Sequence, residues 1–385
     1  MNRWFIALLV FSFCIQLQAQ NDSIPVLFHL DRLDVLNESG RENDRFVLLW
    51  KADKYASDAP LTVVQKKKYW HDDPHAYQSL AIYFWPDATR NDGRYTQRDG
   101  IINPEYQDYD YATLCVLAYK LLYFSSAFYL THKEIYYDAI SRQLRVWFVD
   151  PETRMNPDLE YSQVMPGWDN NEGRAEGIID AYVFNNIIEA VRMVNYVKPL
   201  SPEVRDGVRL WFKEFGKWLN DSEKGKRAYG FAGNHAVNYD LIRYNVSLFC
   251  GDMQTCQKVE REFSRMRLRD QIDRQGKQHY ELRRTRSFFY QVFNLTHIID
   301  VSYLMKSNGY DLYRKNRRLI DRVFRYLHSF EGREEEYPYQ ELDSWDSLRQ
   351  KMAHQAYRVN ELVGKKKYSW GVHDNNAETL ETFLQ

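Results

Sequence analysis

Residues 201–219 read SPEVRDGVRLWFKEFGKWL and show how most of this chain is built. Ser201 suits a helix N-cap, Pro202 suits the first helical position, and Glu203 adds an acid to the first turn. Apolar residues then recur every three or four positions, which is typical of a helix with one buried face. The stretch therefore predicts an amphipathic helix that must pack against other helices.

The same period recurs along most of the chain, with few alternating runs. Because these helical segments follow one another without a block of strands, we expect an all-α fold. Its expected architecture is an (α/α) toroid, or an incomplete barrel, of about six to seven helical hairpins. The further predicted helices are residues 111–130, 134–148, 175–194, 237–249, 257–266, 288–305 and 319–330.

Composition excludes several classes of protein. The chain has 385 residues, with 52 Lys and Arg against 53 Asp and Glu, so its net charge is −1. This balance argues against a generally basic nucleic-acid-binding protein. Apolar residues make up 44% and aromatic residues 16% of the chain, which is enough for a large core and excludes disorder over most of its length.

The N-terminus reads as an export signal. Met1 to Arg3 form a short positive start, an apolar run follows, and Ala19 stands at a plausible cleavage position. The apolar run of about eleven residues is well short of the roughly 20 that a retained spanning helix needs. We predict a signal peptide over residues 1–19, a single domain over residues 20–385, no membrane insertion after cleavage, and a periplasmic location, with secretion or surface attachment as alternatives.

Two stretches interrupt the helical pattern. Residues 69–105 are rich in aromatic and acidic side chains, and residues 156–174 combine Asn, Pro, Asp and Gly. Long irregular segments of this kind usually carry binding residues. We expect the helical scaffold to bring both stretches to one cleft. Cys250 and Cys256 bracket a turn-like insert, so the sequence leaves open whether they form a disulfide.

Six blocks of residues, in order along the chain, resemble the alginate lyase superfamily. The resemblance spans roughly residues 70 to 295 and implies an (α/α) toroid that cleaves a uronic-acid polysaccharide by β-elimination. The blocks are Asp73-Pro74-His75 through Trp85-Pro86-Asp87; Arg98-Asp99-Gly100 with Asn103-Pro104-Glu105; Met155-Asn156-Pro157 through Gln163; Gly173-Arg174 to Ile179-Asp180; Gly233-Asn234-His235; and Glu281-Leu282 with Arg284 to Tyr290.

The resemblance also implies catalytic roles that suit the chemistry. β-Elimination removes the C5 proton and expels O4, so the charge that develops on the uronate carboxylate must be neutralised. Asn234, His235 and Arg284 supply hydrogen-bond donors for that purpose. Tyr290 supplies a phenol, and we expect a neighbouring arginine to lower its pKa towards neutrality. When the C5 proton and O4 lie on one face, as in mannuronate, Tyr290 can act as base and acid; otherwise His235 is the candidate base.

Some assignments stay open at this stage. Tyr239, one helical turn after His235, is the rival phenol, and Arg283 and Arg286 are rivals of Arg284. The residues predicted to bind substrate are Trp85, Gln163, Arg174, Tyr239, Tyr83 and Trp168. Tyr83, Trp85 and Trp168 would stack on sugar rings or else serve as packing anchors.

The predicted partner is an anionic polysaccharide, with no nucleic acid, no cofactor and no metal. His71 and His75 lie near acidic residues, but Pro74 breaks the spacing that metal ligands on a helix would use. The chain departs from the resembled family at Ala236 to Asn238 and at Gln291, so glucuronan and glycosaminoglycans stay open as substrates beside alginate. A hydrolase on the same scaffold and a non-catalytic uronan-binding protein are the other classes. The preferred uronate, endo or exo action and the oligomeric state are not fixed by the sequence.

Overall fold

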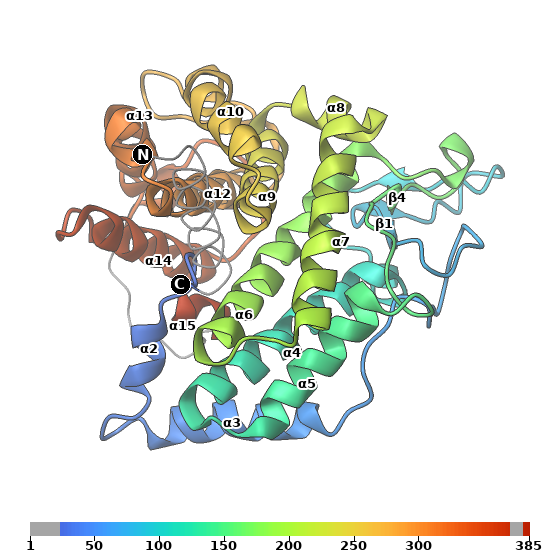
Figure 1. Ribbon diagram of the computed structural model, residues 1–385. Helices are drawn as coiled ribbons and strands as arrows, with labels where there is room; N and C mark the ends of the chain where they lie inside the picture. The colour runs from blue at the N-terminus through green and yellow to red at the C-terminus, as the bar shows by residue number, and fades with distance from the viewer. Residues whose placement is uncertain (1–23, 370–379) are drawn as a thin grey trace, which may run out of the picture.

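The computed structural model describes residues 24–369 and 380–385. The predicted signal peptide, residues 1–19, therefore lies outside the described residues. The chain is largely helical and has the predicted (α/α) toroid fold (Figure 1). Its main helices are α2 (Leu30–Val35), α3 (Glu42–Ala56), α4 (Asp110–Thr131), α5 (Glu134–Leu144), α6 (Val183–Val197), α7 (Pro202–Asp221), α8 (Glu223–Tyr229), α9 (Gly233–Cys250), α10 (Met253–Phe263), α11 (Arg269–Gln271), α12 (Ser287–Ser307), α13 (Leu312–His328), α14 (Trp345–Val363) and α15 (Leu380–Leu384).

The helices form an inner and an outer layer. Helices α4, α6, α9 and α12 are buried on nearly all sides, whereas α7, α10 and α13 bury one face. The prediction for α7 is confirmed: Ser201 Oγ accepts a hydrogen bond from the backbone N–H of Val204, and Pro202 is the first helical residue. Adjacent inner helices pack against one another, α4 on α6 and α9 on α12.

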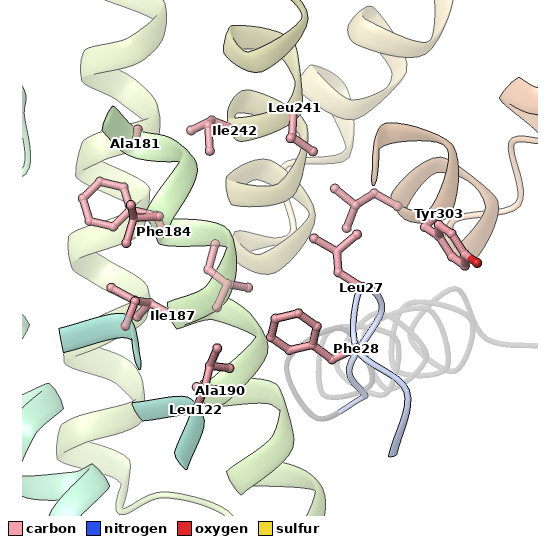
Figure 2. Packing of buried hydrophobic residues seen from close by; sticks show 14 of the residues in the cluster. Leu27, Phe28, Leu122, Ala181, Phe184, Ile187, Ala190, Leu241, Ile242 and Tyr303 are labelled. Atoms are coloured by element: carbon pink, nitrogen blue, oxygen red, sulfur yellow. The ribbon is translucent and has the colours of Figure 1, made fainter. Parts of the chain in front are cut away.

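A single hydrophobic cluster joins the layers. Apolar side chains from α4, α6, α9 and α12 meet the N-terminal segment before α2 at its centre (Figure 2). The residues that show this meeting are Leu27, Phe28, Leu122, Phe184, Ile187, Leu241, Ile242 and Tyr303. Burial of such side chains stabilises each by roughly 1.5 to 3 kcal/mol relative to exposure.

The N-terminal segment is held by a buried carboxylate. Three consecutive backbone N–H groups, from Val26 to Phe28, donate to Oε2 of Glu189 on α6 at 2.7, 2.9 and 3.2 Å. The other oxygen of Glu189 accepts from Arg192, and both side chains are fully buried. The next residue, His29, donates its N–H to the carbonyl of Leu384 in α15. Both end segments of the described chain therefore pack together, with α2 beside α15 (Figure 1).

The strands are short and lie in the two irregular stretches. Strand β1 (Gln78–Leu80) pairs in parallel with β4 (Tyr161–Val164), while β2 (Phe84–Trp85) pairs antiparallel with β3 (Thr96–Gln97). Strand β1 packs on α4, and β4 packs on the 3-10 helix Ala175–Tyr182 that leads into α6. The expectation that residues 69–105 and 156–174 meet is thus confirmed, because β1 and β4 hold them together.

Two further observations concern the whole chain. Among the described residues, only α4 is long and apolar enough to cross a membrane by length and composition, and 67% of its most apolar window is buried inside the protein. Within the same residues Cys115, Cys250 and Cys256 are free thiols, so Cys250 and Cys256 form no disulfide. Burial raises the pKa of each thiol to about 12.

Candidate active site

Tyr290 lies in the first turn of α12, with its side chain 6% exposed. Its hydroxyl is 2.7 Å from the hydroxyl of Tyr83, which directly precedes β2. Arg284 Nη2 donates to the same hydroxyl at 2.7 Å, and its guanidinium lies 3.8 Å from the centre of the Tyr290 ring. The phenolic oxygen of Tyr290 therefore has two polar partners, one of them cationic.

Arg284 is fixed by Asp99. Arg284 Nε and Nη2 donate to Asp99 Oδ1 at 3.1 and 2.5 Å, and Thr285 donates to the same carboxylate from its backbone N–H. Burial raises the pKa of Asp99, but these hydrogen bonds outweigh it, so the pKa is lowered overall and the group is ionised. Gly100 has φ +79°, and a Cβ there would lie 2.5 Å from Thr285 Oγ1. Only glycine permits this close approach, which explains the Asp99-Gly100 pair.

The three neighbouring arginines have different positions. Arg284 contacts Tyr290, Arg283 lies beside the Tyr280 ring, and Arg286 forms two hydrogen bonds with Asp343, at 2.7 and 2.6 Å. Arg286 also donates to the Tyr83 hydroxyl at 3.5 Å. Of the three, Arg284 is therefore the one that the structure places directly at the phenol.

The segment after residue 331, which the sequence left unassigned, reaches back to this site. Glu341 accepts the backbone N–H of Phe289 at 2.9 Å, and the carbonyl of Gln340 accepts that of Ser287 at 3.1 Å. These two contacts satisfy N–H groups that the start of a helix otherwise leaves unpaired, and Asp343 holds the side chain of Arg286 just before the helix. Residues 340–343 thus fix the helix turn that carries Tyr290.

Asn234 and His235 begin helix α9. Gly233 precedes them with φ +66°, and a Cβ there would lie 2.5 Å from Glu281 Oε1. Glu281 accepts the backbone N–H of Asn234 at 2.7 Å and its side-chain Nδ2 at 2.6 Å. Burial raises the pKa of Glu281 to about 7, although the hydrogen bonds from Asn234 and the charge of Arg284 oppose this. Asn234 Oδ1 is buried and has no hydrogen-bond partner among the described residues.

His235 is neutral at pH 7. Its pKa is lowered to about 4 by burial and by the positive charge of Arg284, with Glu176 acting in the opposite direction. The ring stands edge-on to Phe231, with the centroids 6.1 Å apart. A neutral imidazole can donate a hydrogen bond from one nitrogen and accept a proton at the other.

Arg284 lowers the pKa of Tyr290, as expected, but the pKa does not move towards neutrality. Burial and the neighbouring Tyr83 raise the pKa of Tyr290 well above its ordinary value, and this outweighs the lowering by Arg284. Burial is the largest cause, and the charge of Asp99, which pairs with Arg284, adds a smaller upward contribution. The resting form of Tyr290 at neutral pH is therefore the protonated phenol.

Gln163 and Arg174 lie on the strand side of the site. Gln163, in β4, has φ +49° and donates from Nε2 to Asp180 at 2.9 Å, while its N–H donates to Ser79. Such a backbone conformation is strained for a residue other than glycine and often marks a functional position. Arg174 Nη1 contacts Met165 Sδ at 3.0 Å, and its charge contributes to the lowered pKa of His235.

Three aromatic residues predicted to bind substrate occupy different settings. Tyr239 is 2% exposed and donates its hydroxyl to the carbonyl of Leu219, so it lies in the core and does not join the site. Trp85 and Trp168 are half-buried, and each donates from its indole to a backbone carbonyl. Arginine side chains cover both rings: Arg98 lies 5.2 Å from the centre of Trp85 and Arg94 lies 4.7 Å from that of Trp168.

Three carboxylates at the site were not among the predicted site residues. Asp99 and Glu281 stand inside the sequence blocks that carry the resemblance, beside predicted residues, so their position was a usable signal. Asp343 had no such signal, because it lies 57 residues from its partner Arg286. Among the described residues, no group of three or more His, Cys, Asp and Glu side chains is placed to hold a metal ion.

Solved structures of other proteins share this architecture. An alginate lyase from Bacteroides ovatus has a crystal structure that matches with a TM-score of 0.84 and 29% identity, covering 89% of this chain and 93% of that one. Alginate lyase A1-III from Sphingomonas species A1 matches at 0.51 and 14% identity, over 82% and 87% of the two chains. A histidine-to-alanine variant of A1-III bound to a tetrasaccharide matches at 0.57 and 14%, over 89% and 90%. Among curated protein sequences, none matches.

These similarities define the protein as a polysaccharide lyase built on a helical toroid. Within that class, the chain belongs to the alginate lyase family, whose sequence profile matches residues 62–337. The resemblance inferred from six sequence blocks is thereby confirmed.

Proposed function

We propose that this polysaccharide lyase cleaves alginate, above all its mannuronate-rich stretches, by β-elimination. The observation that carries the proposal is the Tyr290 hydroxyl held 2.7 Å from both Arg284 Nη2 and the Tyr83 oxygen. Both partners can donate to a phenolate, so they stabilise the oxygen when its proton has left. The named structural relatives, which are alginate lyases, supply the substrate class.

In the proposed mechanism the uronate carboxylate lies against Asn234, His235 and Arg284. Removal of the C5 proton places negative charge on that carboxylate, and fixed donors lower the barrier because they need no rearrangement. Arg284 uses Nε and Nη2 for Asp99 and Tyr290, so among its described contacts Nη1 is the nitrogen left for substrate. Tyr290 first loses its own proton to solvent; the phenolate then takes the C5 proton and returns it to O4, on the same face of the sugar, as the C4–O4 bond breaks.

A second assignment of the base is favoured by the resting charge states. His235 is neutral, with a pKa lowered to about 4, and Tyr290 is protonated. With these states His235 can accept the C5 proton while Tyr290 donates to O4, which suits a substrate whose two groups lie on opposite faces, such as guluronate. The two assignments predict different preferred polymers.

The place of action is also part of the proposal. The predicted signal peptide and a polymeric substrate outside the cytoplasm together support export to the periplasm. Retention of the protein in the cytoplasmic fraction of its own host would contradict this.

The direct test is the ultraviolet absorbance of the 4,5-unsaturated product. Purified residues 20–385 are incubated with polymannuronate, polyguluronate, glucuronan and glycosaminoglycans, beside the Tyr290→Phe variant. We expect a rise on polymannuronate that the variant abolishes. Tyr239→Phe is the matched control, because it removes a phenol of the core and should keep the activity. Equal rates for the Tyr290→Phe variant and the wild type would exclude Tyr290, and no rise on any polymer would exclude the lyase activity proposed for these substrates.

A further inference from the structure

Glu281 holds Asn234 in an orientation that does not suit a negatively charged ligand. The carboxylate accepts both the backbone N–H and the Nδ2 of Asn234, so the donors of this residue point at Glu281. The side of the amide that faces away from Glu281 carries Oδ1, which is buried and has no partner among the described residues. An oxygen acceptor facing a uronate carboxylate would repel it.

We propose that Glu281 takes up a proton from solvent when a uronate carboxylate binds, and that Asn234 then turns its amide so that Nδ2 faces the substrate. The inference rests on the proposed function for the position of the carboxylate. It adds Glu281 as a positioning residue, which acts on substrate through Asn234.

Both states satisfy the hydrogen bonds between the two residues. In the ionised state Oε1 and Oε2 accept from Asn234 at 2.7 and 2.6 Å. After proton uptake, Oε1 still accepts the backbone N–H, while the new O–H on Oε2 donates to the rotated Oδ1 over the same distance. Asn234 Oδ1, which has no partner in the ionised state, then accepts a hydrogen bond from Glu281. Asn234 Nδ2 is freed and donates to an oxygen of the substrate carboxylate.

The surroundings of Glu281 favour uptake of a proton. The side chain is 1% exposed, and the charged group that acts on it is Arg284 of its own segment, which Asp99 already neutralises. The titratable groups beside Asn234 and Arg284, the two residues that act on Glu281, are neutral: His235 follows Asn234 on α9, His297 on α12 interacts with the backbone of Asn234, and Tyr290 contacts Arg284. The pKa of Glu281 is about 7 before substrate binds, and an added carboxylate nearby raises it further because like charges disfavour ionisation.

Proton uptake can be measured without catalysis. The Tyr290→Phe variant is titrated with a mannuronate tetramer by calorimetry, in buffers of different ionisation enthalpy. At pH 8 we expect uptake of most of one proton per site, and almost none from Glu281 at pH 5.5, where it is protonated before and after binding. The dissociation constant should rise by up to about tenfold per pH unit above pH 7.5, as proton linkage requires.

Two double variants identify the group. Adding Glu281→Gln should abolish the uptake at pH 8 and make the affinity independent of pH, since the glutamine amide is a permanent mimic of the protonated acid. Adding Asp180→Asn should leave the uptake in place; Asp180 is another buried carboxyl near the site, with a pKa raised to about 6 by burial. Two results would overturn the proposal. One is proton uptake at pH 8 by the double variant that carries Glu281→Gln; the other is binding of the tetramer to the Tyr290→Phe variant without any proton uptake.

Kinetics of single variants give an independent readout. On polymannuronate, Glu281→Gln should keep most of kcat, whereas Glu281→Ala, which leaves Asn234 without a partner, should lose at least tenfold. Thermal unfolding followed by circular dichroism checks that both variants fold. If both variants lose activity equally while remaining folded, ionised Glu281 is the required form and the proposal fails. A wild-type protein without activity or binding on any uronan would instead contradict the proposed function.

Discussion

Tyr290 would have to be ionised to act as a base, and His235 would have to be protonated to neutralise the substrate carboxylate with a positive charge. In the resting protein neither residue carries that charge. Tyr290 keeps its proton because burial outweighs Arg284, and His235 is neutral because burial and Arg284 both lower its pKa. The pair is therefore set to donate a proton from the phenol and to accept one at the imidazole. The pH dependence of kcat shows which of the two residues removes the C5 proton.

We predict that kcat at saturating polymannuronate rises with pH from 6 to 9.5. The reason is that the phenolate form of Tyr290 is required, and a pKa raised above the ordinary value keeps this form scarce until the solution is alkaline. If neutral His235 is the base, kcat should instead rise near pH 4, where the imidazole loses its proton, and stay level above that. Initial rates measured across this range on a stable enzyme distinguish the two.

Tyr83→Phe tests the second partner of the Tyr290 phenol. The substitution keeps the ring but removes the hydroxyl that lies 2.7 Å from Tyr290. A lost hydrogen bond of about 1 kcal/mol corresponds to roughly a fivefold lower kcat. Steady-state kinetics should show the loss in kcat with KM nearly unchanged. An unchanged kcat would mean that Tyr83 serves only packing.

At the scale of elements, the first turn of α12 depends on a segment far along the chain. Residues 340–343 supply a carbonyl and two carboxylates to Arg286, Ser287 and Phe289. Negative charge at a helix N-terminus is stabilising, and here it holds the helix turn that carries Tyr290.

We expect Asp343→Ala to lower kcat by about tenfold, since small displacements of a catalytic group are costly. Arg286 would lose both hydrogen bonds to this carboxylate and be left free to turn towards Tyr83. The matched control is Asp346→Ala, which removes an aspartate from an exposed pair with Arg349 three residues along α14. Equal rates for the two variants would show that the segment does not position Tyr290.

The elements were predictable from sequence to the extent that their signals are local. The Ser201-Pro202 start of α7 and the burial of its one apolar face were confirmed, as was the meeting of the two irregular stretches. Arg286 and Asp343, which form an ion pair, are 57 positions apart in the sequence. Asn234 and Glu281, which are hydrogen-bonded, are 47 positions apart. Neither pair leaves a periodic signal. The pKa of Tyr290 is raised by burial and by Tyr83, which lies 207 residues earlier in the chain, and the sequence around Tyr290 shows neither.

For the whole molecule, the buried carboxylate of Glu189 ties the N-terminal segment to the inner helices. We predict that Glu189→Gln lowers the free energy of unfolding by about 3 kcal/mol, because Arg192 loses its buried ionic partner. Denaturant unfolding measures the change. Glu223→Gln removes an exposed pair with Lys226 and should have no measurable effect. Similar stabilities for the two variants would show that the buried pair contributes little.

The contacts of residues 26–28 and 340–343 lie outside the stretch that the family profile matches, residues 62–337. A fragment cut at those two limits would retain Tyr290, His235, Asn234 and Arg284. It would lack the N-terminal segment that packs on the core and the segment that caps helix α12. The stretch that the family profile recognises is therefore shorter than the stretch that we expect to fold on its own. Anyone who shortens the gene to the recognisable homology region should expect an insoluble product rather than a minimal enzyme.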